Sequence, residues 1–128
     1  MDAAQALADL TEISSQVEAA VLFDETGEVA GSTLPGEQDA AALARAAGEL
    51  LARAASLGDG GEVTQVEAST PTGSVFVVRD GSRRIAAVTA ADPTTGLVFY
   101  DLKSCLRDSA PEAKPRRKRA PKKDDDEA

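Results

Sequence analysis

The chain lacks the residue types on which many enzymes and extracellular proteins depend. Its 128 residues include no histidine, no tryptophan and only one cysteine. Without histidine there is no side chain that titrates near neutral pH by default, and a frequent metal ligand is missing. A single cysteine cannot form an internal disulfide, so nothing indicates an oxidising compartment. We therefore expect a protein that is not an enzyme and that binds no metal or cofactor.

Long apolar runs are also absent. No stretch approaches the roughly 20 residues that a membrane-spanning helix needs. The N-terminal residues lack the pattern of a secretory signal peptide. The expectation is a cytoplasmic protein without a membrane span.

The formal net charge is −8, and the charges are distributed unevenly between two parts of the chain. Residues 1–110 carry seven basic and 17 acidic side chains, whereas residues 111–128 carry seven basic and five acidic ones. The second part has no aliphatic residue larger than alanine, which predicts a disordered charged tail after one domain. The tail could improve solubility, tether the domain or contact an acidic surface. The acidic domain and the absence of aromatic residues in the tail argue against specific nucleic-acid binding.

The clearest periodic signal is the sequence DAAALARAAGELLARAASL at residues 39–57. On a helix of about 3.6 residues per turn, its apolar residues fall on two stripes. The stripe expected to pack on the chain's own sheet comprises Leu43, Ala47, Leu50, Ala54 and Leu57. The stripe expected at a dimer interface comprises Ala44, Gly48, Leu51 and Ala55. Gly48 weakens a helix interior by roughly 0.5–1 kcal/mol, which indicates a packing role. The alternative is that alanine is present only as a good helix former.

Patterning elsewhere predicts an antiparallel sheet flanked by further helices. Some segments have apolar residues at helical spacing, and others have apolar residues that alternate with polar ones as in a strand. Turns that contain glycine or proline lie between these segments. The expected helices cover residues 2–15, 39–57 and 97–107, and the expected strands cover 18–24, 28–32, 63–69, 74–79 and 84–90. We expect positive φ at Gly27, a turn at Asp80-Gly81, an N-cap at Asp39 and a helix stop at Gly58. Helix, two strands, helix, three strands and helix make an α+β domain.

No group of residues has the arrangement of an active site. Cys105 lies in an apolar helical pattern without a base to activate it, so we expect a core thiol. Asp24 and Glu25 fall in a predicted hairpin turn and are expected to be solvated. The glycine-rich segment 58–61 lacks the lysine and the following helix of a phosphate-binding loop.

Three segments together resemble the Roadblock family, the dynein-light-chain-type domain. They are the hairpin AAVLFDETGEVAG at residues 19–31, the alanine-rich central helix, and residues 74–106, which end in GLVFYDLKSCL. The resemblance covers about residues 3–108, and its alanine- and arginine-rich style is similar to bacterial, actinobacterial members. It implies a profilin-like fold in which a five-stranded antiparallel sheet lies between helices.

The resemblance also implies partners. Roadblock domains form homodimers, or heterodimers with a paralogous Roadblock protein, and bacterial members are similar to regulators or scaffolds of small Ras-like GTPases. The family has no shared catalytic residue, so the proposed partner-binding residues are the arginines Arg45 and Arg53, with Arg83 and Arg84 as further candidates. One alternative is a structural platform or adaptor in a signalling or cytoskeletal assembly without GTPase contact. A small-molecule sensor is another, although so few aromatic residues favour a filled core.

Overall fold

A computed structural model describes residues 2–58 and 62–110 of the chain. The elements in order are α1 (Ala3–Ile13), β1 (Val17–Asp24), β2 (Val29–Ser32), α2 (Glu37–Ala55), β3 (Gln65–Thr70), β4 (Gly73–Asp80), β5 (Arg83–Ala90) and α3 (Thr95–Asp108). The predicted order is confirmed, and each expected element ends within two residues of the observed one. The expected tail lies outside the described residues.

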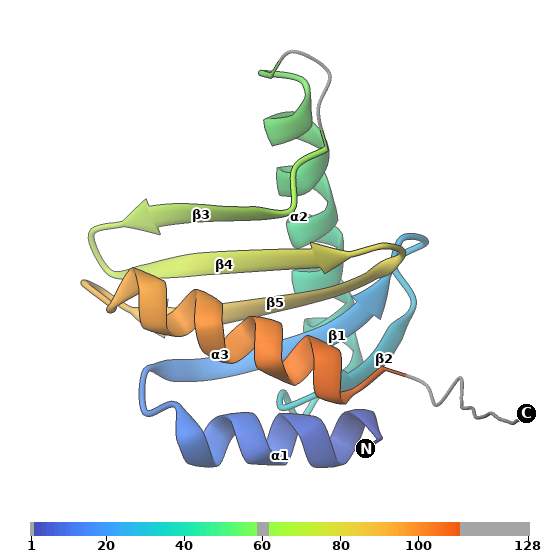
Figure 1. The fold of residues 1–128 in the computed structure, drawn as a ribbon, viewed down its shortest axis with the longest axis vertical. Helices are drawn as coiled ribbons and strands as arrows, with labels where there is room; N and C mark the ends of the chain where they lie inside the picture. Colours follow the sequence, from blue (N-terminus) through green and yellow to red (C-terminus); the bar gives the residue numbers. More distant parts are fainter. Residues whose placement is uncertain (1, 59–61, 111–128) are drawn as a thin grey trace, which may run out of the picture.

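The five strands form one sheet in the order β2-β1-β5-β4-β3, and every neighbouring pair is antiparallel. Figure 1 shows α1 and α3 side by side on one face of this sheet and α2 crossing the other face. The predicted α+β class is therefore confirmed as a three-layer arrangement. Positive φ angles at Gly27 (91°) and Gly81 (64°) allow the tight β1–β2 and β4–β5 turns.

The ends of α2 differ from the prediction. Gly36 is the N-cap residue and makes no side-chain capping bond, so the expected N-cap at Asp39 is wrong. Asp39 instead lies in the first turn, where its negative charge favours the positive end of the helix dipole. The helix ends at Ala55, before Gly58, and the Ser56 backbone N–H donates to the Ala52 carbonyl oxygen.

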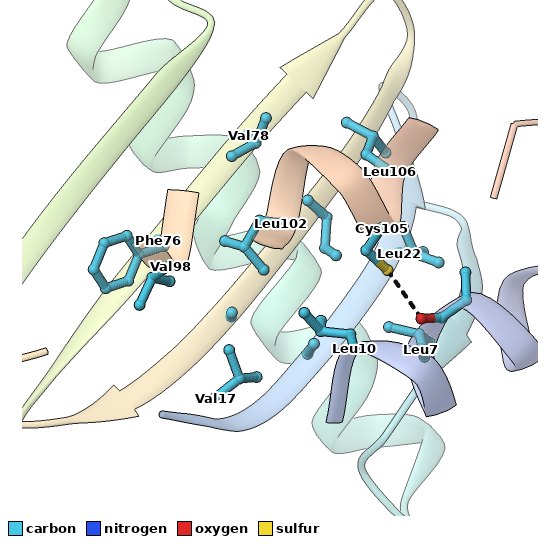
Figure 2. Close-up of a cluster of buried hydrophobic side chains, with 14 residues drawn as sticks. Leu7, Leu10, Val17, Leu22, Phe76, Val78, Val98, Leu102, Cys105 and Leu106 are labelled. Atoms are coloured by element: carbon cyan, nitrogen blue, oxygen red, sulfur yellow. Dashed lines mark hydrogen bonds between the residues drawn. The ribbon is translucent and has the colours of Figure 1, made fainter. Parts of the chain in front are cut away.

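Side chains of the sheet, α1 and α3 meet in one buried core, which we call the closed core (Figure 2). Its largest fully buried side chains include Phe76, Ile85 and Leu102, and the Phe76 ring meets Phe99 edge to face with centroids 5.0 Å apart. Each such burial stabilises the fold by about 1.5–3 kcal/mol. Cys105 belongs to this core, as expected, and its thiol donates a weak hydrogen bond to the Ala6 carbonyl oxygen at 3.4 Å.

The core between the sheet and α2 is left partly open. One helix covers this face, and half-buried side chains surround the buried cluster. The buried members are Val21, Phe23, Ala40, Ala44, Ala47, Leu51, Val77 and Ala86. The half-buried members are Val29, Leu43, Leu50, Val63, Val66 and Val75. In the closed core, by contrast, only Ala3 and Phe99 are described as half-buried members. The α2 face therefore presents apolar surface that the described part of the chain does not cover.

The predicted assignment of the two α2 stripes is wrong at three positions, whereas Ala47 is fully buried as expected. Ala44 and Leu51, which were assigned to a dimer interface, are buried against the chain's own sheet. Leu57, which was assigned to the core, is 88% exposed. The buried stripe runs between the two predicted ones, because alanine at positions 40, 44 and 47 lets the helix backbone approach the valines and phenylalanine of the sheet closely.

Gly73 offers a test of how tightly β4 pairs with β5. A Cβ atom at this position would lie 2.6 Å from the Thr89 carbonyl oxygen, so the backbone would have to shift. We expect Gly73→Ala to lower the free energy of unfolding by about 1–3 kcal/mol in urea melts. The matched control is Gly96→Ala in α3, where a Cβ meets nothing within 4 Å and the substitution should not destabilise the helix. Equal stability of the two variants would contradict the close approach.

Candidate functional site

A groove of about 640 Å³ lies between α2 and one end of the sheet. Its floor is a row of three residues on adjacent strands, in which Phe23 of β1 pairs with Arg84 of β5 and Arg84 pairs with Arg79 of β4. All three point to the α2 face, since their neighbours Leu22, Ile85 and Val78 belong to the opposite core. We call this site the arginine groove.

Small residues of α2 form one wall of the arginine groove. Ala44, Gly48 and Ala52 line it, and a Cβ atom at Gly48 would meet nothing within 4 Å. The rim is charged, because Arg45 and Glu49 of α2 and the β1–β2 turn also line the groove. The wall therefore leaves open space above two guanidinium groups.

The two floor arginines have different partners. Arg79 Nη2 lies 2.8 Å from Glu62 Oε2, and the arginine side chain is 19% exposed while the glutamate is 79% exposed. Arg84 is half-buried. Its Nε and Arg79 Nη2 are both buried nitrogens without a hydrogen-bond acceptor in suitable geometry among the described residues, so the contact of Arg79 with Glu62 is an ion pair without a hydrogen bond. Like charges directly opposite each other in an antiparallel pair are destabilising. The described structure thus supplies a carboxylate to one arginine of the pair.

Asp24, at the rim, makes its hydrogen bonds within the β1–β2 turn. Its Oδ1 accepts hydrogen bonds from the Thr26 hydroxyl and from the backbone N–H groups of Thr26 and Glu28, at 2.8 and 3.1 Å for the last two. These bonds, with that from the Thr26 side chain the strongest, hold the pKa of the Asp24 carboxyl below its usual range. Asp24 therefore stays ionised at neutral pH and has the solvated turn role expected from the sequence.

The structure separates the predicted site residues. Ala44 and Leu51 lie in the core, whereas Gly48 and Ala55 are half-buried and line the arginine groove. Arg45 is exposed at the groove rim, and Arg53 is exposed on α2 but does not line the groove.

Arg83, a further sequence candidate, faces the other side of the sheet. It donates to the Leu106 carbonyl oxygen at 2.9 Å and also to the Ser109 hydroxyl. Sequence reasoning missed the pairing of Arg79 with Arg84. The signal was available, since the two arginines flank the predicted β4–β5 turn symmetrically and such positions are opposite each other in a hairpin.

Residues 2–58 and 62–110 contain neither a metal-binding cluster nor a membrane-spanning helix. No three histidine, cysteine, aspartate or glutamate side chains come together there in a group that could hold a metal ion. No helix in that part of the chain is both long and apolar enough to cross a membrane.

Comparisons with known proteins relate the chain to others through structure. No family model and no curated protein sequence matches it. A Roadblock/LC7 domain from Streptomyces avermitilis superposes with a TM-score of 0.75 at 21% identity, covering 84% of this chain and 94% of that domain. MglB of Myxococcus xanthus gives 0.62 at 16% identity, with 82% and 79% covered. LokiProfilin2, solved in complex with rabbit actin, gives 0.58 at 13% identity, with 81% and 92% covered.

These neighbours establish the fold. The chain has the Roadblock/LC7 fold, which is shared with bacterial proteins and is profilin-like. The resemblance drawn from the sequence is thus confirmed at the level of the fold.

Cys105 is the one thiol of the chain and its pH dependence is testable. Burial, with a smaller contribution from Asp108, raises its pKa to about 11, so the folded protein holds it as a neutral thiol. The unfolded chain ionises near its ordinary value of about 8.5. Below about pH 8.5 the thiol is neutral in both states and the free energy of unfolding is at its full value. As the pH rises to 11, only the unfolded chain loses this proton, so the free energy of unfolding falls. We expect urea melts to show a loss on the order of 2 kcal/mol between pH 8 and 11. A Cys105→Ala variant should lack this component, and identical pH profiles would contradict the assignment.

Proposed function

We propose that the chain is a non-enzymatic, dimeric binding module that regulates or scaffolds a small Ras-like GTPase. The observation that carries the proposal is the partly open core under α2, where half-buried apolar side chains border the buried cluster. Burying such surface is favourable, and a second copy of the chain offers the matching surface.

The surface for pairing runs along one flank of α2. Leu43 and Leu50 are half-buried there, Ala46 is exposed, and Leu57 continues the stripe just beyond the helix. We call these four residues the outer stripe. In Figure 1 the C-terminal end of α2 projects past β3, which is the edge strand of the sheet. A two-fold arrangement would bring two β3 edges and two projecting helices together, so that each outer stripe packs on the other copy.

The outer stripe differs from the interface expected from the sequence. Gly48 and Ala55, the two members of that interface that are not in the core, lie on the arginine-groove flank of α2. On a helix, Gly48 and Leu50 point about 160° apart. The two flanks therefore make two distinguishable interfaces, and either could pair with the same chain or with a paralogous Roadblock protein.

The GTPase role rests on the fold and on the resemblance of the sequence to bacterial Roadblock proteins. A domain of this kind would act by ordering the GTPase's own catalytic groups or by holding it in place. An arginine supplied from outside is the general alternative for stimulating hydrolysis. Arg45 is exposed at the groove rim and stays available to such a partner, whereas Arg53 is exposed beside Leu50 and Leu57 and borders the outer stripe.

The choice of flank can be tested with two variants. We expect the double variant Ala46→Glu, Leu57→Glu to weaken self-association at least about tenfold, because it places two charges on the outer stripe. We expect Gly48→Leu to leave the dimer intact, since the added side chain enters open space on the other flank. Sedimentation equilibrium measures both, with circular dichroism to check folding. A monomeric Gly48→Leu variant would place the interface on the groove flank, and a monomeric wild-type chain would remove the dimer.

The GTPase role requires a separate experiment. Pulldown with the Ras-like GTPase encoded nearest to this chain should recover a complex in the GDP or the GTP-analogue state. A nucleotide-hydrolysis assay then distinguishes a regulator, which changes the rate, from a scaffold, which does not. A dimer that binds the GTPase in neither state would favour the alternative of a platform or adaptor without GTPase contact.

A further inference from the structure

We infer that the arginine groove is a docking site for an acidic segment of a partner protein. The groove lies on the flank of α2 away from the outer stripe, so it stays open when two copies pair through that stripe. The inference does not depend on whether the partner is a GTPase, and it holds for a monomer or for a dimer paired through the outer stripe. A dimer paired through the groove flank would cover the site and overturn it.

The floor of the groove holds a pair of like charges, and the acidic residues that line the groove, Asp24, Glu25 and Glu49, lie at its rim. Arg79 and Arg84 are directly opposite each other on β4 and β5, and both are at least partly removed from water. Arg84 also holds a buried Nε without a described acceptor. A buried donor without a partner and a like-charge cross-strand pair both cost free energy. A negatively charged group bound in the groove would offset the like-charge repulsion.

One arginine of the floor already forms an ion pair with a carboxylate. The Glu62 carboxylate, on an exposed side chain, lies 2.8 Å from Arg79 Nη2. Arg84 occupies the equivalent cross-strand position one strand further into the sheet and lacks such a partner among the described residues. Guanidinium groups bind carboxylates through short, charge-assisted hydrogen bonds, often two at a time. An aspartate or glutamate side chain of a partner would supply Arg84 with the counter-charge that Glu62 supplies to Arg79.

The walls and rim favour a peptide over a phosphate. Ala52 and Ala55 give apolar surface beside the arginines, and the open space at Gly48 admits a backbone. At the rim, the ionised Asp24 and the neighbouring Glu25 and Glu49 repel a multiply charged anion. A segment with single carboxylates between small apolar side chains meets both conditions.

Binding of a labelled peptide to the full chain tests the inference. The probe is a rhodamine-labelled peptide of about eight residues with one central glutamate between alanines, and its binding is followed by anisotropy at physiological ionic strength. We expect Arg84→Gln to weaken binding at least about tenfold, because it removes the guanidinium that lacks a partner. Gly48→Leu should weaken it as well, by filling the groove. The matched control is Arg107→Gln, an exposed arginine on α3, which should change affinity less than about twofold.

Urea melts accompany the binding assay. We expect Arg84→Gln to be at least as stable as the wild type, which separates a lost site from a lost fold. A variant that unfolds is replaced by Arg84→Met, which keeps the length and apolar stem of the side chain.

Four results would overturn the inference. One is an equal loss of affinity in Arg84→Gln and Arg107→Gln, which would mean non-specific attraction. Another is unchanged affinity for a peptide with glutamine in place of glutamate. Competition by inorganic phosphate as strong as by the unlabelled peptide would indicate an oxyanion site instead. Stronger binding after Asp124, Asp125, Asp126 and Glu127 are changed to their amides would make the chain's own acidic end the occupant.

Discussion

The architecture depends on how three helices divide between the two faces of one five-stranded sheet. Two helices close one face, where large side chains such as Phe76 and Leu102 fill the core. One helix remains for the other face, and it is too narrow to cover five strands. The apolar side chains left at its flanks, among them Val66 and Val75, are surface that a lone copy exposes to water. This imbalance is the physical reason why the fold is suited to binding.

Small side chains let α2 serve this open face in two ways. Ala40, Ala44 and Ala47 bring the helix backbone close to the sheet, so that a narrow contact still excludes water. On the next flank, the absence of a side chain at Gly48 keeps the space above the floor arginines open. A larger residue at either place would change the helix-to-sheet distance or fill the groove. The alanine-rich composition is thus a geometric requirement as well as a helix-forming one.

Sequence patterns predicted the elements well and the faces of α2 poorly. Strand alternation and turn glycines such as Gly27 and Gly81 are local, so they located the hairpins. The predicted stripes of α2 were both apolar and adjacent, and periodicity alone cannot say which line between them meets the sheet. The arginine groove was missed for another reason. Arg79 and Arg84 become neighbours only through strand register, which sequence reasoning had not followed to the side chains.

The separation of α2 into a core stripe and an outer stripe has an evolutionary consequence. Positions 46 and 57 are exposed and can change without disturbing the residues that hold the helix to the sheet, whereas Leu43 and Leu50 also pack against that core. After a gene duplication, two descendants could therefore drift at these positions until each prefers the other to itself, while both keep the same monomer. A self-associating ancestor can in this way give rise to an obligate pair of different chains.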